Sequence, residues 1–478
     1  MTLAFADRTL RIALLAGEIL VLAWLFATED LTNVGYLLLA IALTLGMVAL
    51  VFSKWPTGCV FLLTIGAALS RFSVTLGGLH LRPEYVATSL AIVAIVVHFG
   101  GHVELNLRLR DFDYWLLAYV GMNFFSSLVT SPQPSKTLRW ATLNALVIIP
   151  YFLIRILIRS DRQIWLALRA LLYVGLCEAI WGTLASVSNH VFGTTWGVEV
   201  GQYGSIPGTY GTQYEANLFG SYTGCIAVMF LTLFLLSRER TRFWYGWGAM
   251  LALLAAVFSL ARSVLLGLPI PILAVFFISV RKGQFELRRL LPLAIGLGLV
   301  LAMLSPFVLE YIGQRFSTLG TDDLDYDPST YGRLVQMTAA LQDVSVHPVF
   351  GTGTSSFQLL FDYSEWFGPV ADNVEDNGGA YIGNTPLRVL HDTGVVGLAV
   401  FLVFLATLAR ASYRALRVAT HSTKVSIVAL SAGLLLYAIT FQATEATLLT
   451  FTWIHLGLLA AAATVALNHA RPPESAPE

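Results

Sequence analysis

Residues 214–236 read YEANLFGSYTGCIAVMFLTLFLL, an apolar run of 23 residues whose single charged residue, Glu215, stands second. A helix of about 20 apolar residues crosses the hydrocarbon core of a bilayer, which is about 30 Å thick. Backbone groups in lipid must bond to one another, which restricts spanning segments to helices and closed barrels. Barrel strands alternate apolar and polar residues over about ten positions, and this run does not. It therefore predicts a transmembrane helix.

Similar runs recur along the whole chain, which is 56% hydrophobic and only 12% charged. Soluble domains carry about 25% charged residues. The chain therefore predicts an all-α fold, a polytopic transmembrane bundle of about 14 spans (range 12–14) forming one integral membrane domain over residues 1–478. The expected spans are about 10–27, 34–53, 57–79, 84–100, 112–131, 138–158, 163–190, 214–236, 243–260, 264–280, 289–312, 385–407, 424–441 and 447–468.

Positive charge is distributed unevenly between the connections that join these spans. Of the 29 Lys and Arg residues, 20 fall on the side that holds the N-terminus and seven on the other. Cytoplasmic loops carry the excess of Lys and Arg, so both termini are expected in the cytoplasm, including a disordered tail over 471–478. The net charge is zero, which gives no indication of a nucleic-acid partner. The three cysteines show neither a disulfide framework nor metal-ligand spacing.

The longest connection, about 313–384, is expected on the outer side and is the only one that could form a small extramembrane subdomain. Asp327-Pro328-Ser329 is a typical helix start. An apolar stripe at helical spacing follows, formed by Leu334, Met337, Leu341 and Val344. This pattern favours an amphipathic helix that lies on the outer membrane surface. Long loops without structure are usually functional, so a site is expected here.

Three arginines on the outer side are candidates for binding an anion. Arg262 lies in FSLARSVLLGLPI, where two short spans meet with almost no loop between them, so its turn should be recessed below the interface. An arginine there needs a partner or a water-filled cavity, and its planar fork suits a phosphate or pyrophosphate. Arg333 lies on the amphipathic helix, and Arg315 flanks an acidic cluster. The alternative for each is a structural pair with a carboxylate.

Three further residues could act on an acceptor hydroxyl. Glu215 could be a general base, or it could cap the helix that it precedes. His391 and Asp392 lie about two turns inside a span, where ionisable residues are functional candidates, although a structural packing pair is the alternative. The glycine pair of HPVFGTGTSSF lacks the lysine of a nucleotide-binding P-loop and suits a tight turn after a helix.

Four segments in this order resemble the O-antigen ligase and polymerase superfamily, bacterial membrane glycosyltransferases of the GT-C type. GTYGTQYEANLFGSY resembles the Gly-rich outer segment of that family, and FSLARS is similar to its Ser-Arg turn. STYGRLVQMTAALQDVSVHPVFGTGTSSF resembles its outer loop, and GNTPLRVLHDTGVVGLAVF resembles its closing segment. The first 200 residues resemble the family only as generic spans.

The resemblance implies an activity and a location. Such enzymes sit in the bacterial cytoplasmic (inner) membrane and take a glycan from an undecaprenyl-pyrophosphate carrier on its outer face. They transfer that glycan, with inversion and without a metal or cofactor, to a sugar hydroxyl. Two arginines are thought to hold the pyrophosphate, and they match Arg262 and Arg333. A growing polysaccharide would be the acceptor, with the bilayer, a chain-length regulator and export proteins as further partners.

The chain departs from this family at one position. Ligases of the family carry a histidine just before the Asn of the closing segment, and here Gly383 precedes Asn384. The departure favours a polymerase of surface or exopolysaccharide over a ligase, with Glu215, His391 or Asp392 as the acceptor-side group. Further substrate-binding residues are expected to be Arg315, Arg388, Asn384 and Tyr214. A transporter of lipid-linked glycan and a scaffold of an export complex remain alternatives, although no repeat symmetry or broken helix is evident in the sequence.

Overall fold

The computed structural model describes residues 56–72, 74–76, 79–99, 109–199, 208–239, 242–281, 328–362, 366 and 380–469. The expected spans 10–27, 34–53 and 289–312, together with Arg315 and the tail 471–478, lie outside these described residues. Seven helices among the described residues are long and apolar enough to cross a membrane, by length and composition. The all-α class is therefore confirmed, while the count of about 14 spans stays a prediction.

The first part of the described chain forms five helices and a hairpin. They are α3 (Thr57–Ala68), β1 (Val74–Leu76), β2 (Leu79–Leu81), α4 (Pro83–Phe99), α5 (Asp111–Val129), α6 (Pro134–Leu157) and α7 (Asp161–Phe192). The expected span 57–79 is wrong in its second half, because α3 ends at Ala68 and β1 pairs antiparallel with β2, Val74 opposite Leu81. The pairing of Leu76 with Leu79 reverses the chain direction between the strands, which a continuous helix over this stretch does not allow.

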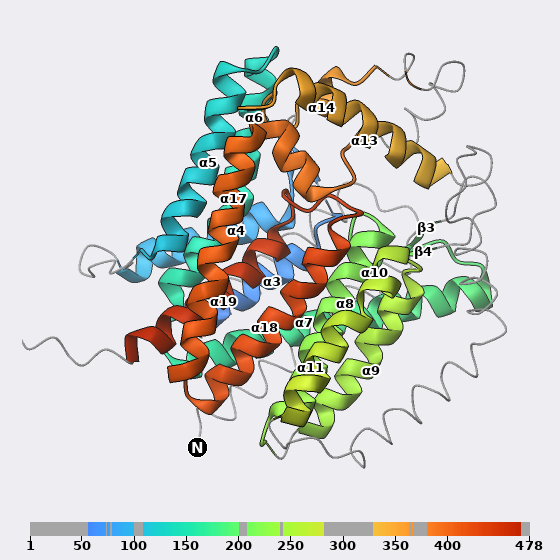
Figure 1. The fold of residues 1–478 in the computed structure, drawn as a ribbon. Coiled ribbons are helices and arrows are strands. Elements are labelled where there is room, and N and C mark those ends of the chain that lie inside the picture. The colour runs from blue at the N-terminus through green and yellow to red at the C-terminus, as the bar shows by residue number, and fades with distance from the viewer. Residues whose placement is uncertain are drawn as a thin grey trace, which may run out of the picture.

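The second part contains the longest helix and a second short strand pair. Its elements are β3 (Val198–Glu199), β4 (Gly208–Thr209), α8 (Ala216–Leu236), α9 (Arg242–Phe258), α10 (Arg262–Gly267), α11 (Pro269–Arg281), α13 (Pro328–Val346), α14 (Phe357–Leu360), α17 (Thr385–Val418), α18 (His421–Thr440) and α19 (Thr450–His469). α8 is the most buried of the seven candidate spans, and α19 is next. Figure 1 shows both among the other helices, as expected for segments that are apolar on every side.

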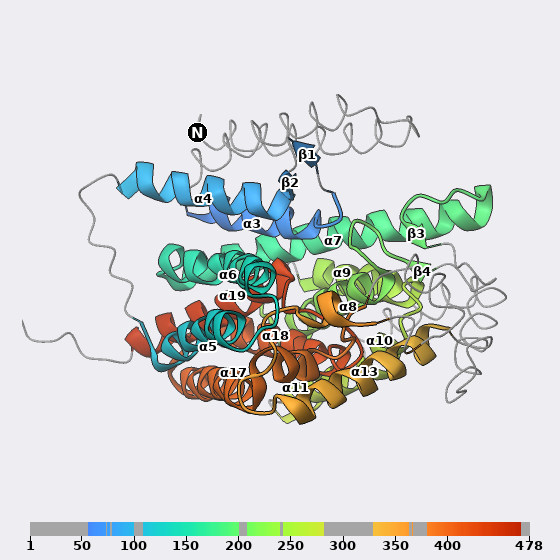
Figure 2. The ribbon, with the colours of Figure 1, turned by 90° about the horizontal axis from the view of Figure 1, so that it is seen from above.

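Small residues allow the buried helices to approach closely. Ala460, Ala461, Ala462 and Ala463 of α19 are all fully buried. At Gly457 an added Cβ would lie 2.9 Å from the Cα of Tyr151 in α6, closer than real Cβ atoms come. Lipid supplies no hydrophobic force between helices, so van der Waals contact between such small residues stabilises the bundle. α3 and α4 form a layer beside α7, which crosses the molecule in Figure 2.

We call the end of the bundle where α8 and α17 begin and α18 ends the site end. Figure 1 shows α13 and α14 at this end. The helix expected from Asp327-Pro328-Ser329 is confirmed, since α13 begins at Pro328. Leu334 and Leu341 are 47% and 53% exposed, whereas Gln336 and Ala340 on the other face are buried. The exposed leucines agree with an apolar outer stripe, and contact of that stripe with a membrane surface stays a prediction.

α17 is interrupted at Gly394, whose φ is 67° and ψ is −173°. The freed backbone groups bond to the segment Pro348–Gly353, which carries the glycine pair of HPVFGTGTSSF. The amide of Val395 donates to the carbonyl of Pro348 (2.8 Å), and the carbonyl of Asp392 accepts from the amide of Gly353 (3.0 Å). Gly351 and Gly353 have φ of 70° and 98°, so the segment is the tight turn that its glycines indicate. The sequence did not predict this broken helix.

Candidate functional site

The connection between α18 and α19, Phe441–Leu449, organises the site end. It is fastened to the beginning of α17: the amide of Thr385 donates to the carbonyl of Phe441 (2.9 Å), and the Thr385 hydroxyl donates to the carbonyl of Thr444 (3.0 Å). Asn384 caps α17 by accepting from the amide of Leu387 (2.8 Å), and its Nδ2 donates to the carbonyl of Gln442 (2.9 Å). Both polar groups of the Asn384 side chain are thus bonded within the protein.

Arg333 of α13 reaches this connection. Its Nη1 donates to the carbonyl of Ala443 (2.8 Å). The Cβ that a side chain at Gly383 would carry lies 3.5 Å from the Cγ of Arg333 and 3.6 Å from the Cε2 of Tyr381. Gly383, the position of the family histidine, is therefore flanked by the stem of Arg333 and the ring of Tyr381. Burial, together with the nearby charge of Glu215, raises the pKa of the Tyr381 phenol, so it stays protonated at neutral pH.

Glu215 lies on the other side of the same connection. It is the N-cap residue of α8, but its side chain makes no capping hydrogen bond. The carboxylate Oε1 instead accepts from the hydroxyl of Thr444 (2.8 Å). Glu215 thus stands at the N-cap position that the capping alternative expects, but its carboxylate bonds to Thr444 and not to a backbone amide of α8. Adjacent residues of one connection, Ala443 and Thr444, bind Arg333 and Glu215, which brings a guanidinium and a carboxylate to one place.

The turn that precedes Arg262 packs on the beginning of α8. Leu260 has a φ of 52°, and α10 begins at Arg262 directly after this turn. An added Cβ at Gly208 of β4 would lie 3.0 Å from both the Cβ of Ala216 and the carbonyl oxygen of Ser259. β4 therefore lies between the start of α8 and the Arg262 turn, so that Arg262, Glu215 and Arg333 all lie at the site end. Figure 1 shows α10 beside β4.

Two arginines that precede α4 hold the segment 208–215 in place. The Nη1 of Arg71 donates to the carbonyl of Tyr214 (3.1 Å), and its guanidinium carbon lies 3.7 Å from the centroid of the Tyr210 ring. The guanidinium carbon of Arg82 lies 5.0 Å from the centroid of the Tyr214 ring. Cation–π contacts of this kind stabilise an exposed site by about 0.5–1 kcal/mol. Tyr214 therefore positions the segment that leads into Glu215.

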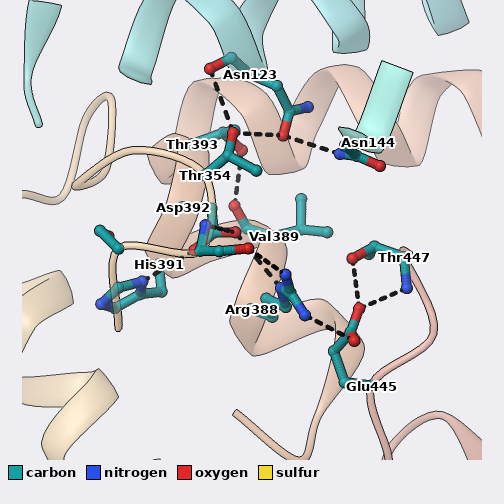
Figure 3. A network of polar contacts seen from close by, with 12 residues as sticks. Asn123, Asn144, Thr354, Arg388, Val389, His391, Asp392, Thr393, Glu445 and Thr447 are labelled. Atoms are coloured by element: carbon teal, nitrogen blue, oxygen red, sulfur yellow. Dashed lines mark hydrogen bonds and ion pairs between the residues drawn. The ribbon is translucent and has the colours of Figure 1, made fainter. Parts of the chain in front are cut away.

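Arg388 and Asp392 belong to a separate, buried network (Figure 3). The side chain of Arg388 is 5% exposed, and its Nη1 lies 2.6 Å from the Oε2 of Glu445. Its Nε lies 3.5 Å from the Oδ2 of Asp392, and its Nη2 donates to the hydroxyl of Ser355 (2.5 Å). The same Oδ2 accepts from the amide of Ser355 (2.9 Å). The network joins α17 to the turn before α14 and to the α18–α19 connection.

His391 is fully buried beside this network. Its Nδ1 lies 3.1 Å from the Oδ1 of Asp392, and its Nε2 lies 3.1 Å from the Oδ2 of Asp343. Since both ring nitrogens already face a carboxylate, neither is placed to accept a proton from an acceptor hydroxyl. The geometry therefore favours a structural role for His391 and Asp392, in which they hold α13 and the glycine turn against the broken α17.

Sequence reasoning did not select Tyr381, Thr444 or Glu445. Tyr381 stands two residues before Gly383, the position that carries a histidine in the ligases. A bulky residue so close in sequence could have indicated that it occupies the space left by the missing histidine side chain. Thr444 and Glu445 lie in QATEATLL, a short polar stretch between two apolar runs. That stretch resembles any interhelical turn, and only its contacts with residues more than 50 positions away distinguish it.

Comparison with known families bears on the same part of the chain. The O-antigen ligase family model matches residues 247–402, a stretch that begins in α9 and ends in α17 and includes Arg262, Arg333 and Gly383. Glu215 and Tyr214 lie outside the match. The chain matches no curated protein. The apolar helices and this match indicate an integral membrane protein. Over residues 247–402, about a third of its length, the chain is similar to the O-antigen ligase family.

Proposed function

We propose that the protein is an inverting glycosyltransferase that polymerises oligosaccharide repeats carried on undecaprenyl pyrophosphate, at the outer face of the bacterial cytoplasmic membrane. The observation that carries the proposal is the convergence of Arg333 and Glu215 on Ala443 and Thr444, beside the turn that presents Arg262. A fixed cation beside a fixed carboxylate is what a reaction with an anionic leaving group and a hydroxyl nucleophile needs.

In the proposed reaction Arg262 and Arg333 bind the pyrophosphate of the donor lipid. The acceptor hydroxyl attacks the anomeric carbon from the face opposite the pyrophosphate, while Glu215 takes the hydroxyl proton. The bond between the anomeric carbon and the phosphate oxygen breaks, and its electron pair leaves with the pyrophosphate. Guanidinium groups that are already oriented stabilise the charge that develops on this leaving group. The products are a glycan longer by one transferred unit and undecaprenyl pyrophosphate.

Glu215 is suited to the base role by its position. Its Oε1 is held by Thr444, while no capping bond to α8 occupies the carboxylate. Glu215→Gln keeps an oxygen for the Thr444 hydroxyl but removes the basicity, so it separates positioning from proton transfer. A general base contributes about 10²–10⁴ in rate. We expect the glutamine variant to fold as the wild type does and to lose transfer by a factor in that range.

A ligase that transfers finished glycan to a lipid or protein acceptor is the second candidate. The matching family is described as O-antigen ligase, which favours it. Gly383, in the place of the ligase histidine, favours the polymerase. The two activities differ in their products, because a polymerase makes a ladder of lengths from lipid-linked repeats alone and a ligase needs a separate acceptor.

The decisive experiment gives purified protein in proteoliposomes lipid-linked repeat units and resolves the products by length. Wild type should make a ladder, whereas Arg262→Ala and Arg333→Ala should not. Arg417→Ala is the matched control, because Arg417 is an exposed arginine in the last turn of α17, away from the site end. Full activity in both site variants would overturn the mechanism. Movement of intact lipid-linked glycan across the bilayer, without new glycosidic bonds, would instead indicate a transporter.

A further inference from the structure

A cavity of about 490 Å³ lies at the end of the bundle opposite the site end. It is formed where α7 and α18 begin and where α8 has ended, so it is separated from Glu215 by the length of α8. Its lining consists of Asp161, Arg162, Trp165, Ser237, Arg238, Glu239, His421, Ser422 and Val425. This volume is within the range of about 300–1,000 Å³ that is usual for small-molecule sites. The proposed transfer reaction makes no use of it.

The two carboxylates in the lining are already bonded within the protein. Asp161 accepts from the hydroxyls of Thr420 (3.0 Å) and Thr423 (2.6 Å). Glu239 lies 2.7 Å from the Nη2 of Arg169, an arginine just behind the lining, and accepts from the hydroxyl of Tyr245 (2.9 Å). Both carboxylates are therefore engaged by groups of the protein itself.

The arginines of the lining are arranged differently. Arg162 and Arg238 are both exposed, and neither has an ion-pair partner within the described part of the chain. Together with Arg169 behind the lining, they give this end three guanidinium groups and two carboxylates. α18 also begins at this cavity, and its N-cap Thr420 makes no side-chain capping bond, which leaves the positive end of the helix directed toward the cavity. The cavity is thus electropositive and suits a phosphate group.

Aromatic side chains at the same end mark the level of the membrane surface. Phe243, Trp244 and Trp247 in the first turns of α9 are 56%, 71% and 44% exposed. Exposed Trp residues concentrate where the bilayer meets water, at the depth of lipid headgroups. Trp165 lines the cavity itself, with the guanidinium carbon of Arg169 5.2 Å from its ring centroid. At this depth the bilayer presents phosphate as part of lipid headgroups, which distinguishes it from free phosphate in solution.

We propose that this cavity binds the phosphodiester headgroup of an anionic phospholipid, with Arg162 and Arg238 as its principal ligands. The excess of Lys and Arg predicts that this end is cytoplasmic, so the lipid comes from the inner leaflet, whose negative surface attracts basic residues. The site is independent of the transfer reaction and anchors α7 and α18 at a fixed depth in the bilayer.

The test is native mass spectrometry of the purified full-length protein with added phosphatidylglycerol or phosphatidylethanolamine. Wild type should retain phosphatidylglycerol in preference. Arg162→Gln and Arg238→Gln should each reduce this preference about fivefold, and the double variant more, since each arginine near an anionic surface contributes a factor of that size. Arg414→Gln is the matched control. Arg414 is an exposed arginine near the C-terminus of α17, but it does not line the cavity.

Three outcomes would overturn the proposal. They are an unchanged preference in the double variant, an equal loss in Arg414→Gln, and displacement of the lipid by inorganic phosphate at the same concentration. The last would assign the cavity to a soluble phosphate. Each variant contributes only if it elutes as a single species of wild-type size, and the two single variants keep the test valid if the double variant fails to fold.

Discussion

Replacing Arg388 by Met should destabilise the protein far more than it alters the chemistry of transfer. Methionine keeps an unbranched apolar stem and removes the charged guanidinium, so Glu445 and Asp392 would each be left as a buried carboxylate. Their side chains are 15% and 7% exposed beside an Arg388 that is 5% exposed. Removal of one partner from a buried ion pair costs about 3–5 kcal/mol, because the remaining charge is uncompensated.

The expected loss can be measured as a shift of the thermal midpoint in one detergent at one scan rate. An unfolding entropy of about 2 cal/mol/K per residue gives a chain of 478 residues a shift of about 1 °C per kcal/mol, so a loss of about 3–5 kcal/mol lowers the midpoint by about 3–5 °C. Arg388→Met combined with Glu445→Gln should recover part of the loss, since the double variant no longer buries the unpaired Glu445 carboxylate. The exposed Arg417 gives the control, and Arg417→Met should change stability by less than about 0.5 kcal/mol.

This prediction also tests whether Arg388 binds substrate, as its sequence context suggested. A substrate-binding arginine would lose transfer activity on substitution while the midpoint stayed within the range of the Arg417→Met control. Abolished transfer in a variant of unchanged midpoint would therefore refute the structural role that we assign to Arg388, and with it the same role for Asp392.

Three further predictions concern single residues. Gly394→Ala should prevent folding, because the φ of 67° is strained for alanine and the added Cβ would lie 2.2 Å from the carbonyl oxygen of Val349. Gly332→Ala is the control, because a Cβ at Gly332 meets nothing within 4 Å, and it should give a normal size-exclusion peak. A normal peak for both variants would contradict the account of the broken α17. Gly383→His should fold with a midpoint close to that of wild type, because its Cβ would meet its nearest neighbour at 3.5 Å, and a fall in the midpoint comparable to that of Arg388→Met would show that the gap is filled. The pKa of Tyr381 is raised above its ordinary value of 10.0. The neutral phenol therefore favours folding below pH 10, and this contribution is lost as the pH rises through the folded-state pKa. Tyr381→Phe should accordingly lose thermal midpoint less steeply than wild type above pH 10, and an identical slope would refute this assignment.

Much of this architecture follows from local properties of the sequence. The length of an apolar run decides whether a helix can cross a bilayer, so α6, α7, α8, α18 and α19 were predicted within a few residues. α13 was predicted from the proline at its start and from its apolar spacing. The span 57–79 failed because a hairpin of three-residue strands is as apolar as the helix before it. Arg262 was selected because charge is costly beside lipid, Arg333 because it lies on the amphipathic outer helix, and Glu215 because it stands at the outer start of a span.

The tertiary structure decided which of the selected residues lie together at the site end and which are bonded to other side chains of the protein. Glu215 and Thr444 are 229 residues apart, and the short connection that carries Thr444 has no pattern that marks it. His391 and Asp392 are as prominent in the sequence as Glu215 is, yet their partners Asp343 and Ser355 lie on segments brought in by the break at Gly394. A charged residue within an apolar run indicates that its charge must be compensated by some partner. What compensates it, a ligand or another side chain, depends on contacts between distant segments, and those exist only once the helices have packed.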